Sequence, residues 1–197
     1  MRFSKKTAAK RGMSDLSITI WTRASPRRKR ILSTIFILIV AIAVTGLGTL
    51  VPIDQQEAKK ISNDLNQTVT TLGNEGALMQ YILGNNLLIC LLMFIPIIGP
   101  LLGLYIMFNT GTVVGAIAIA SGVSPALALT ALFITPVAWL EFAAYSTAMT
   151  ESIWLFRRAL QGRGFRELRK NTTMFITIAT VLLAIGAIVE TALISIA

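Results

Sequence analysis

The chain has 197 residues, of which 54% are apolar and only 14% are charged. With a mean hydropathy of +0.71, this composition is typical of an integral membrane protein and excludes an ordinary soluble domain. The chain has no histidine, a single cysteine (Cys90) and no P-loop motif. These absences exclude histidine-dependent catalysis, an internal disulfide and P-loop nucleotide hydrolysis, so we predict a non-enzymatic protein without a catalytic residue, metal or cofactor.

The first 30 residues carry ten basic side chains and one acid, Asp15. Such a segment directly before an apolar stretch is typical of a cytoplasmic topology signal that also attracts anionic lipid. We favour this interpretation over a nucleic-acid-binding arm. Residues 31–53 are uncharged and longer than the apolar core of a signal peptide, so they predict a retained transmembrane helix rather than a cleaved one.

Residues 54–77 repeat apolar side chains at intervals of three and four, which predicts an amphipathic surface helix. Its four acids outnumber its two lysines, which favours the non-cytoplasmic side of the membrane. Asn66 begins an Asn-Gln-Thr glycosylation sequon, a short motif that is frequent by chance.

Three further apolar stretches predict membrane spans at 78–95, 100–120 and 125–149. The turns between them are marked by the sequences FIPIIGP and SGVSP, and Pro136 predicts a kink in the third stretch. Residues 151–171 carry six basic side chains and two acids, which predicts a cytoplasmic loop of interfacial character. A last span is predicted at 172–196.

These segments together predict an all-α, multi-pass bundle of five transmembrane helices. The arm at 1–30 would be cytoplasmic, the membrane domain would cover 31–197, and the C-terminus would lie outside. Each charged segment then falls on the side that the positive-inside rule expects.

Five polar side chains fall within the predicted spans: Asn85, Asn86, Asn109, Glu141 and Glu190. Polar groups without partners are costly in hydrocarbon, so we expect the first four to form a cluster inside the bundle. Glu190 lies nearer the outer boundary, where its carboxylate is expected to reach the interface.

Two interpretations of Glu141 stay open. As a structural group it would accept hydrogen bonds from an amide such as Asn86 or Asn109 and hold helices together. Interhelical hydrogen bonds contribute only about 0.6 to 2 kcal/mol, which is a weak reason to keep an ionisable group there. As a functional group Glu141 would bind a proton or a cation, or line a path through the membrane.

Four glycines recur at intervals of four or eight and predict close helix packing without chemistry: Gly99, Gly103, Gly111 and Gly115.

The sequences GNNLLI (84–89), FIPIIGPLLGLYIMFNTGTVVGA (94–116) and TPVAWLEFAAY (135–145) resemble the stage II sporulation protein M family. Asn86, Asn109 and Glu141 match the family pattern. The family has His-Gly after the proline, where this chain has Val137-Ala138, so a family role that needs a titrating imidazole is in doubt here. In spore-forming bacteria the resemblance implies a scaffold in a complex that remodels the cell wall.

We therefore expect a non-enzymatic subunit or scaffold of a cell-membrane complex. Its expected partners are anionic lipid at the basic arm and loop, other protein subunits, and a second copy of the chain, with no nucleic acid. The alternative is a permease-like transport subunit that uses Glu141 to couple a proton or a cation.

Overall fold

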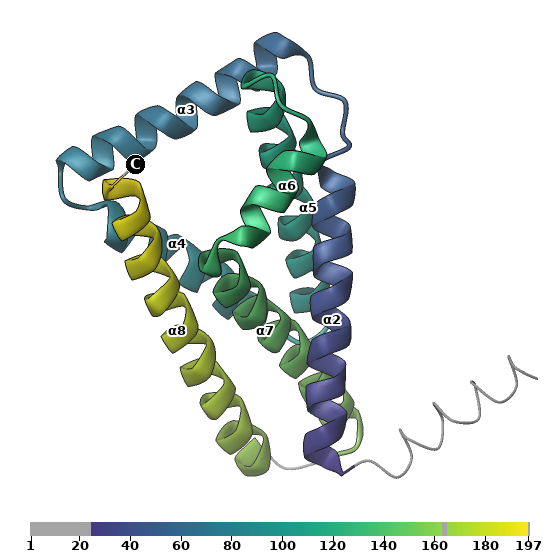
Figure 1. The fold of residues 1–197 in the computed structure, drawn as a ribbon. Helices are drawn as coiled ribbons and strands as arrows, with labels where there is room; N and C mark the ends of the chain where they lie inside the picture. Colours follow the sequence, from purple (N-terminus) through teal and green to yellow (C-terminus); the bar gives the residue numbers. More distant parts are fainter. Residues whose placement is uncertain (1–24, 163–164, 197) are drawn as a thin grey trace, which may run out of the picture.

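In the computed structural model, residues 25–162 and 165–196 are described, with the backbone alone at 26, 27 and 165–171. All regular structure in these ranges is helical. The helices in chain order are α2 (Pro26–Gly48), α3 (Gln55–Asn74), α4 (Leu78–Leu92), α5 (Ile98–Ala120), α6 (Pro125–Ile134), α7 (Pro136–Leu160) and α8 (Phe165–Ser195) (Figure 1).

Helices α2 and α5 pack along each other through residues with small side chains. A Cβ atom at Gly111 would overlap the Thr45 carbonyl oxygen, and one at Gly48 would overlap the Phe108 carbonyl oxygen. Glycine at these positions therefore lets the two backbones approach closely. Gly115 lies against Thr49 in the same contact.

Helix α3 crosses one end of the bundle and joins its two sides (Figure 1). Asp54 caps its start by accepting hydrogen bonds from the backbone N–H groups of Gln56 and Glu57, at 2.8 and 3.0 Å. Helix α3 packs mainly against α5 and to a smaller extent against α4. Ala58 is its only buried residue, so most of this helix faces outward.

Helices α6 and α7 meet at an angle of 84°. Pro136 lacks an N–H and forces the preceding Thr135 out of the helical region, to an extended ψ of 140°. The indole N–H of Trp139 donates to the Phe133 carbonyl oxygen at 2.8 Å, and Phe133 and Phe142 pack edge to face. The predicted single kinked span at 125–149 is therefore two helices.

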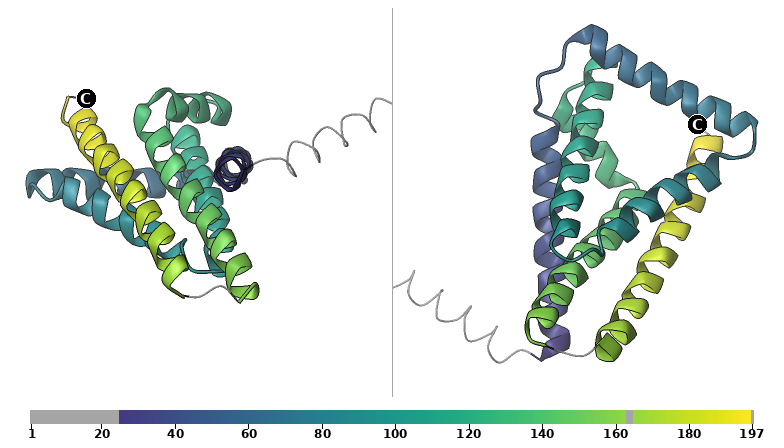
Figure 2. Two further views of the ribbon diagram at one scale, coloured as in Figure 1. Left: turned by 90° about the horizontal axis from the view of Figure 1, so that it is seen from below. Right: turned by 180° about the vertical axis from the view of Figure 1, so that it is seen from behind.

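The core lies between α2, α4, α5, α7 and α8. Its largest fully buried side chains include Met93, Met107, Met149 and Leu183. Seen from behind, α4 slants from the end of α3 toward the start of α5, while α7 and α8 run side by side (Figure 2).

Three helices are long and apolar enough to cross a membrane, at Arg28–Gly48, Ile98–Ala120 and Thr172–Ser195, and the bent α6–α7 pair makes up to four. With 15 residues, α4 is about 22 Å long, shorter than the roughly 30 Å hydrocarbon core. The prediction of five spans is not confirmed, and the sides on which the termini lie stay predictions.

Two predicted segments overlap helices. Most of the predicted loop at 151–171 is helical, because α7 continues to Leu160 and α8 begins at Phe165. Its cytoplasmic position stays a prediction. Gly162, with φ of +65°, ends the first of these helices in a left-handed turn that glycine adopts without strain. The predicted arm at 1–30 ends earlier, since α2 begins at Pro26 after the N-cap Ser25. Residues 1–24 lie outside the described part of the chain.

Candidate functional site

Glu141 and Asn86 are joined by a hydrogen bond between α7 and α4. The Asn86 Nδ2 atom donates to Glu141 Oε1 at 2.5 Å. Both side chains come from apolar helices and both are partly buried. Asn85 is exposed and donates weakly to Asn86 Oδ1, at 3.5 Å. The structure thus places Asn85, Asn86 and Glu141 together.

Glu190 approaches the same place from α8. A Cβ atom at Gly186 would lie 4.0 Å from Glu141 Cγ, so Glu141 packs against α8 at this glycine. Glu190 follows one turn later on the same face of α8. The site therefore contains two acids, although Glu190 was predicted to reach the outer boundary by itself.

Tyr145 completes this group from α7, one turn after Glu141. It is only 4% exposed, and its position four residues after Glu141 places it on the same face of α7. We call Asn86, Glu141, Tyr145 and Glu190 the acid–amide site. Asn109 is partly buried on α5 and forms no side-chain hydrogen bond with the others in the described part of the chain.

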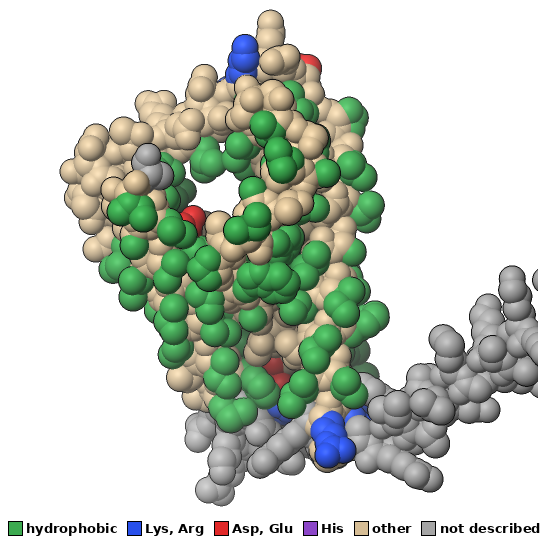
Figure 3. Space-filling view, viewed as in Figure 1, with side chains coloured by type: hydrophobic (Ala, Val, Ile, Leu, Met, Phe, Trp, Pro, Cys, Tyr) green, Lys and Arg blue, Asp and Glu red, His purple; other side chains and the backbone are tan. Residues whose placement is uncertain are grey.

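An opening lies beside the acid–amide site. The space-filling view shows it passing through the molecule between α3, α6 and α8, with an acidic side chain at its α8 edge (Figure 3). Apolar side chains cover much of the surface around it. Leu65 of α3 is 43% exposed although it belongs to the apolar stripe of that helix.

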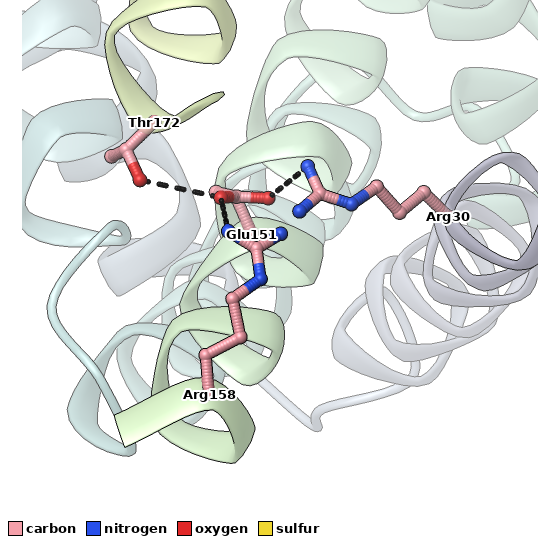
Figure 4. Close-up of polar contacts among 4 residues, drawn as sticks. All are labelled: Arg30, Glu151, Arg158 and Thr172. Carbon is pink, nitrogen blue, oxygen red and sulfur yellow. Dashed lines mark hydrogen bonds and ion pairs between the residues drawn. The ribbon is translucent and has the colours of Figure 1, made fainter. Parts of the chain in front are cut away.

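A second polar cluster lies at the opposite end of the bundle and is centred on Glu151 (Figure 4). Arg30 Nη1 lies 3.0 Å from Glu151 Oε2, and Arg158 Nη1 lies 3.5 Å from Oε1. The Thr172 hydroxyl donates to Oε1 at 3.3 Å. The Glu151 side chain is only 2% exposed, so α2, α7 and α8 meet around a buried carboxylate.

Aromatic rings enclose the Arg30 side chain of this cluster. Its guanidinium carbon lies 5.1 Å from the centre of the Phe175 ring and 5.7 Å from that of Trp154. Cations are attracted to aromatic faces at such distances. The guanidinium carbon of the exposed Arg157 lies 5.3 Å from the centre of the Trp154 ring.

Sequence reasoning missed the Glu151 cluster because Glu151 was assigned to a loop. A signal was present: Glu151 and Arg158 are seven residues apart, which places them on one face of a helix two turns apart. The pair can be recognised only if the helix is predicted to continue beyond residue 149.

The four predicted packing glycines all lie in close contacts. Gly111 and Gly115 meet α2, Gly103 meets the Met149 side chain, and Gly99 meets the Met93 carbonyl oxygen. Asn66 is exposed on α3, where a sequon would be accessible. Among the described residues, no group of three or more histidine, cysteine, aspartate or glutamate side chains could hold a metal ion.

Comparison with known proteins gives one match. A family described as stage II sporulation protein M matches residues 31–194, which include every described helix except the first turn of α2 and the last residue of α8. No curated protein and no solved structure matches the chain. The match covers the acid–amide site, the packing glycines and all of the Glu151 cluster except Arg30. The chain is therefore a membrane protein that belongs to the stage II sporulation protein M family.

Proposed function

We propose that this protein is a non-enzymatic subunit of a cell-membrane complex, in which its helix bundle serves as a scaffold for other proteins. The observation that carries the proposal is that two acids, one within the predicted spans and one at the end of the bundle, bind side chains of other helices. Glu141 bonds across to α4, and Glu151 bonds across to α2 and α8. Both acids join separate helices, as a rigid docking framework requires.

The two ends of the bundle suit different partners. Arg28 and Arg157 are exposed near the Glu151 cluster and could bind anionic headgroups or a cytoplasmic subunit. At the other end, α3 exposes most of its polar side chains. A second copy of the chain could bind through the apolar outer faces of the spans. We assign no nucleic-acid partner.

Substitutions at Glu141 test the scaffold role. Gln keeps the shape and a hydrogen-bond acceptor for Asn86, whereas Leu removes the acceptor. The scaffold role predicts normal accumulation and partner recovery for Glu141→Gln, and reduced values for Glu141→Leu. Normal recovery of the Leu variant in a quantitative pull-down from native membranes would count against it.

Transport is the second candidate function, and the α6–α7 break favours it. Discontinuous helices near the middle of a bilayer are common at the substrate sites of transporters. Here the break lies five residues before Glu141, and an opening lies beside it. A proton-coupled role predicts that Glu141→Gln abolishes pH-dependent flux in proteoliposomes while the fold is kept. Unchanged flux would exclude it.

A further inference from the structure

The carboxylates of Glu141 and Glu190 lie in apolar surroundings with no basic partner near them in the described part of the chain. The described ion pairs join Arg30 and Arg158 to Glu151, at the other end of the bundle. Keeping two neighbouring carboxylates charged in a medium of low dielectric constant is unfavourable. Such a pair is stabilised by a bound proton or by a cation that neutralises it.

Tyr145 gives a second, independent indication of a ligand. It is 4% exposed, yet its hydroxyl forms no hydrogen bond with another described residue. The described buried polar side-chain atoms that lack a hydrogen-bond partner belong to Ser146, Thr150 and Arg158, and the last of these still forms an ion pair with Glu151. The Tyr145 hydroxyl and the Glu141 Oε2 atom are not among them, so both unpartnered atoms reach open space.

The opening supplies that space. Helix α3 has 20 residues and is therefore about 30 Å long, and it reaches from α5 to α4. Since the opening passes between α3, α6 and α8, an apolar molecule could enter it sideways from the membrane (Figure 3).

The side chains of the acid–amide site indicate which class of ligand it could bind. Two carboxylates repel anions, and Asn86 already uses its Nδ2 donor on Glu141. An organic ammonium group offers three donors, which suits a site that contains two carboxylates and a hydroxyl group. The Tyr145 ring adds a face that attracts cations. A divalent metal fits less well, because Ca²⁺ takes six to eight oxygen ligands.

We propose that the acid–amide site binds an organic ammonium ion with an apolar body, which enters through the opening from the membrane. Glu141 and Glu190 neutralise its charge, and the Tyr145 hydroxyl accepts one of its hydrogen bonds. This deepens the transport candidate and rests on Glu141 being its site. It does not depend on the scaffold role.

Binding of dansylcadaverine, a fluorescent primary amine, to the purified protein in phosphatidylcholine nanodiscs tests the proposal. We expect saturable binding, and no binding of the same probe with its amine acetylated. Glu141→Gln and Glu190→Gln should each weaken binding about tenfold or more, since each removes a charge-assisted contact. Tyr145→Phe should weaken it less. Glu75→Gln, a control in an exposed residue at the end of α3, should leave it unchanged.

Equal binding of the acetylated probe, or unchanged binding in both acid variants, would overturn the proposal. A matching decrease in the Glu75→Gln control would also overturn it, since it would indicate nonspecific surface attraction. The comparison of the two probes on the unaltered protein decides the question even where a variant fails to fold. Because binding is measured without flux, a protein that binds the amine but shows no flux contradicts transport and leaves this site intact.

Discussion

Arg30 and Glu151 form a buried ion pair, at 3.0 Å, between the first turns of α2 and the second half of α7 (Figure 4). The two residues are 121 positions apart in the chain. Their contact joins the start of α2 to α7. Because Arg158 and Thr172 bind the same carboxylate, removing Glu151 affects three helices together.

Glu151→Leu should lower the free energy of unfolding by about 3 to 5 kcal/mol, because it leaves Arg30 and Arg158 without their buried partner. Unfolding in mild detergent, followed by thermal denaturation or by accessibility of Cys90 to a thiol reagent, measures this. A change below about 1 kcal/mol, the range of exposed pairs, would contradict the assignment of a buried network.

Arg157 and Arg158 provide a matched pair of neighbouring arginines. The Arg158 side chain is 7% exposed and lies against Glu151, whereas the Arg157 side chain is exposed and lies against the Trp154 ring. Arg158→Leu should destabilise the protein by more than about 2 kcal/mol and Arg157→Leu by less than about 1 kcal/mol. Equal losses of stability in the two variants would mean that α7 is rotated about its axis relative to its orientation in the structure.

Gly111 tests the contact between α2 and α5. Alanine there would overlap the Thr45 backbone, which cannot move aside as a side chain can, so Gly111→Ala should cost about 1 to 3 kcal/mol of stability. Gly84→Ala is the control, because nothing lies within 4 Å of the added methyl group. It should be neutral or stabilise α4 by up to about 1 kcal/mol.

Asn86 tests the bond to Glu141. Asn86→Ala should lower stability by about 1 to 2 kcal/mol, because it removes an interhelical hydrogen bond from a partly buried carboxylate. Asn85→Ala should change it by less than about 0.5 kcal/mol, since Asn85 is exposed. A larger loss of stability from Asn85→Ala than from Asn86→Ala would mean that Asn85, and not Asn86, binds Glu141.

Ile97 occupies a strained turn between α4 and α5. Its φ is +70° and its ψ is −54°, and the Ile98 N–H donates to the Pro96 carbonyl oxygen at 2.8 Å, which is the pattern of a γ-turn. A β-branched residue is disfavoured there, so Ile97→Gly should stabilise the protein by about 1 kcal/mol. Destabilisation in a thermal unfolding assay would show that the Ile97 side chain contributes more than the strain costs.

The sequence predicted the helical class and most helix positions, because long apolar stretches leave the backbone no alternative to a helix in a membrane. It also predicted the turn near residues 94–100 and a kink at Pro136, where the structure has a break between two helices. The size of that break, 84°, depends on how Trp139 and Phe133 pack across it, and a local pattern does not contain that information.

The candidate site was less predictable. The pairing of Glu141 with Asn86 was one of two amide contacts considered, and only the packing of α4 against α7 distinguishes it from one with Asn109. Glu190 joins the site because Gly186 lets α8 approach Glu141, which is a tertiary contact. Glu151 was assigned to a loop, because its charged neighbours outweighed the helical spacing.

Purification of the tagged protein from its native membrane in mild detergent, with the stoichiometry of all co-purifying proteins, tests the scaffold role most directly. The account predicts a partner in a fixed ratio that is retained by Glu141→Gln and reduced by Glu141→Leu. Recovery of the protein alone, or only as a homo-oligomer, in both the unaltered and the variant forms would contradict it.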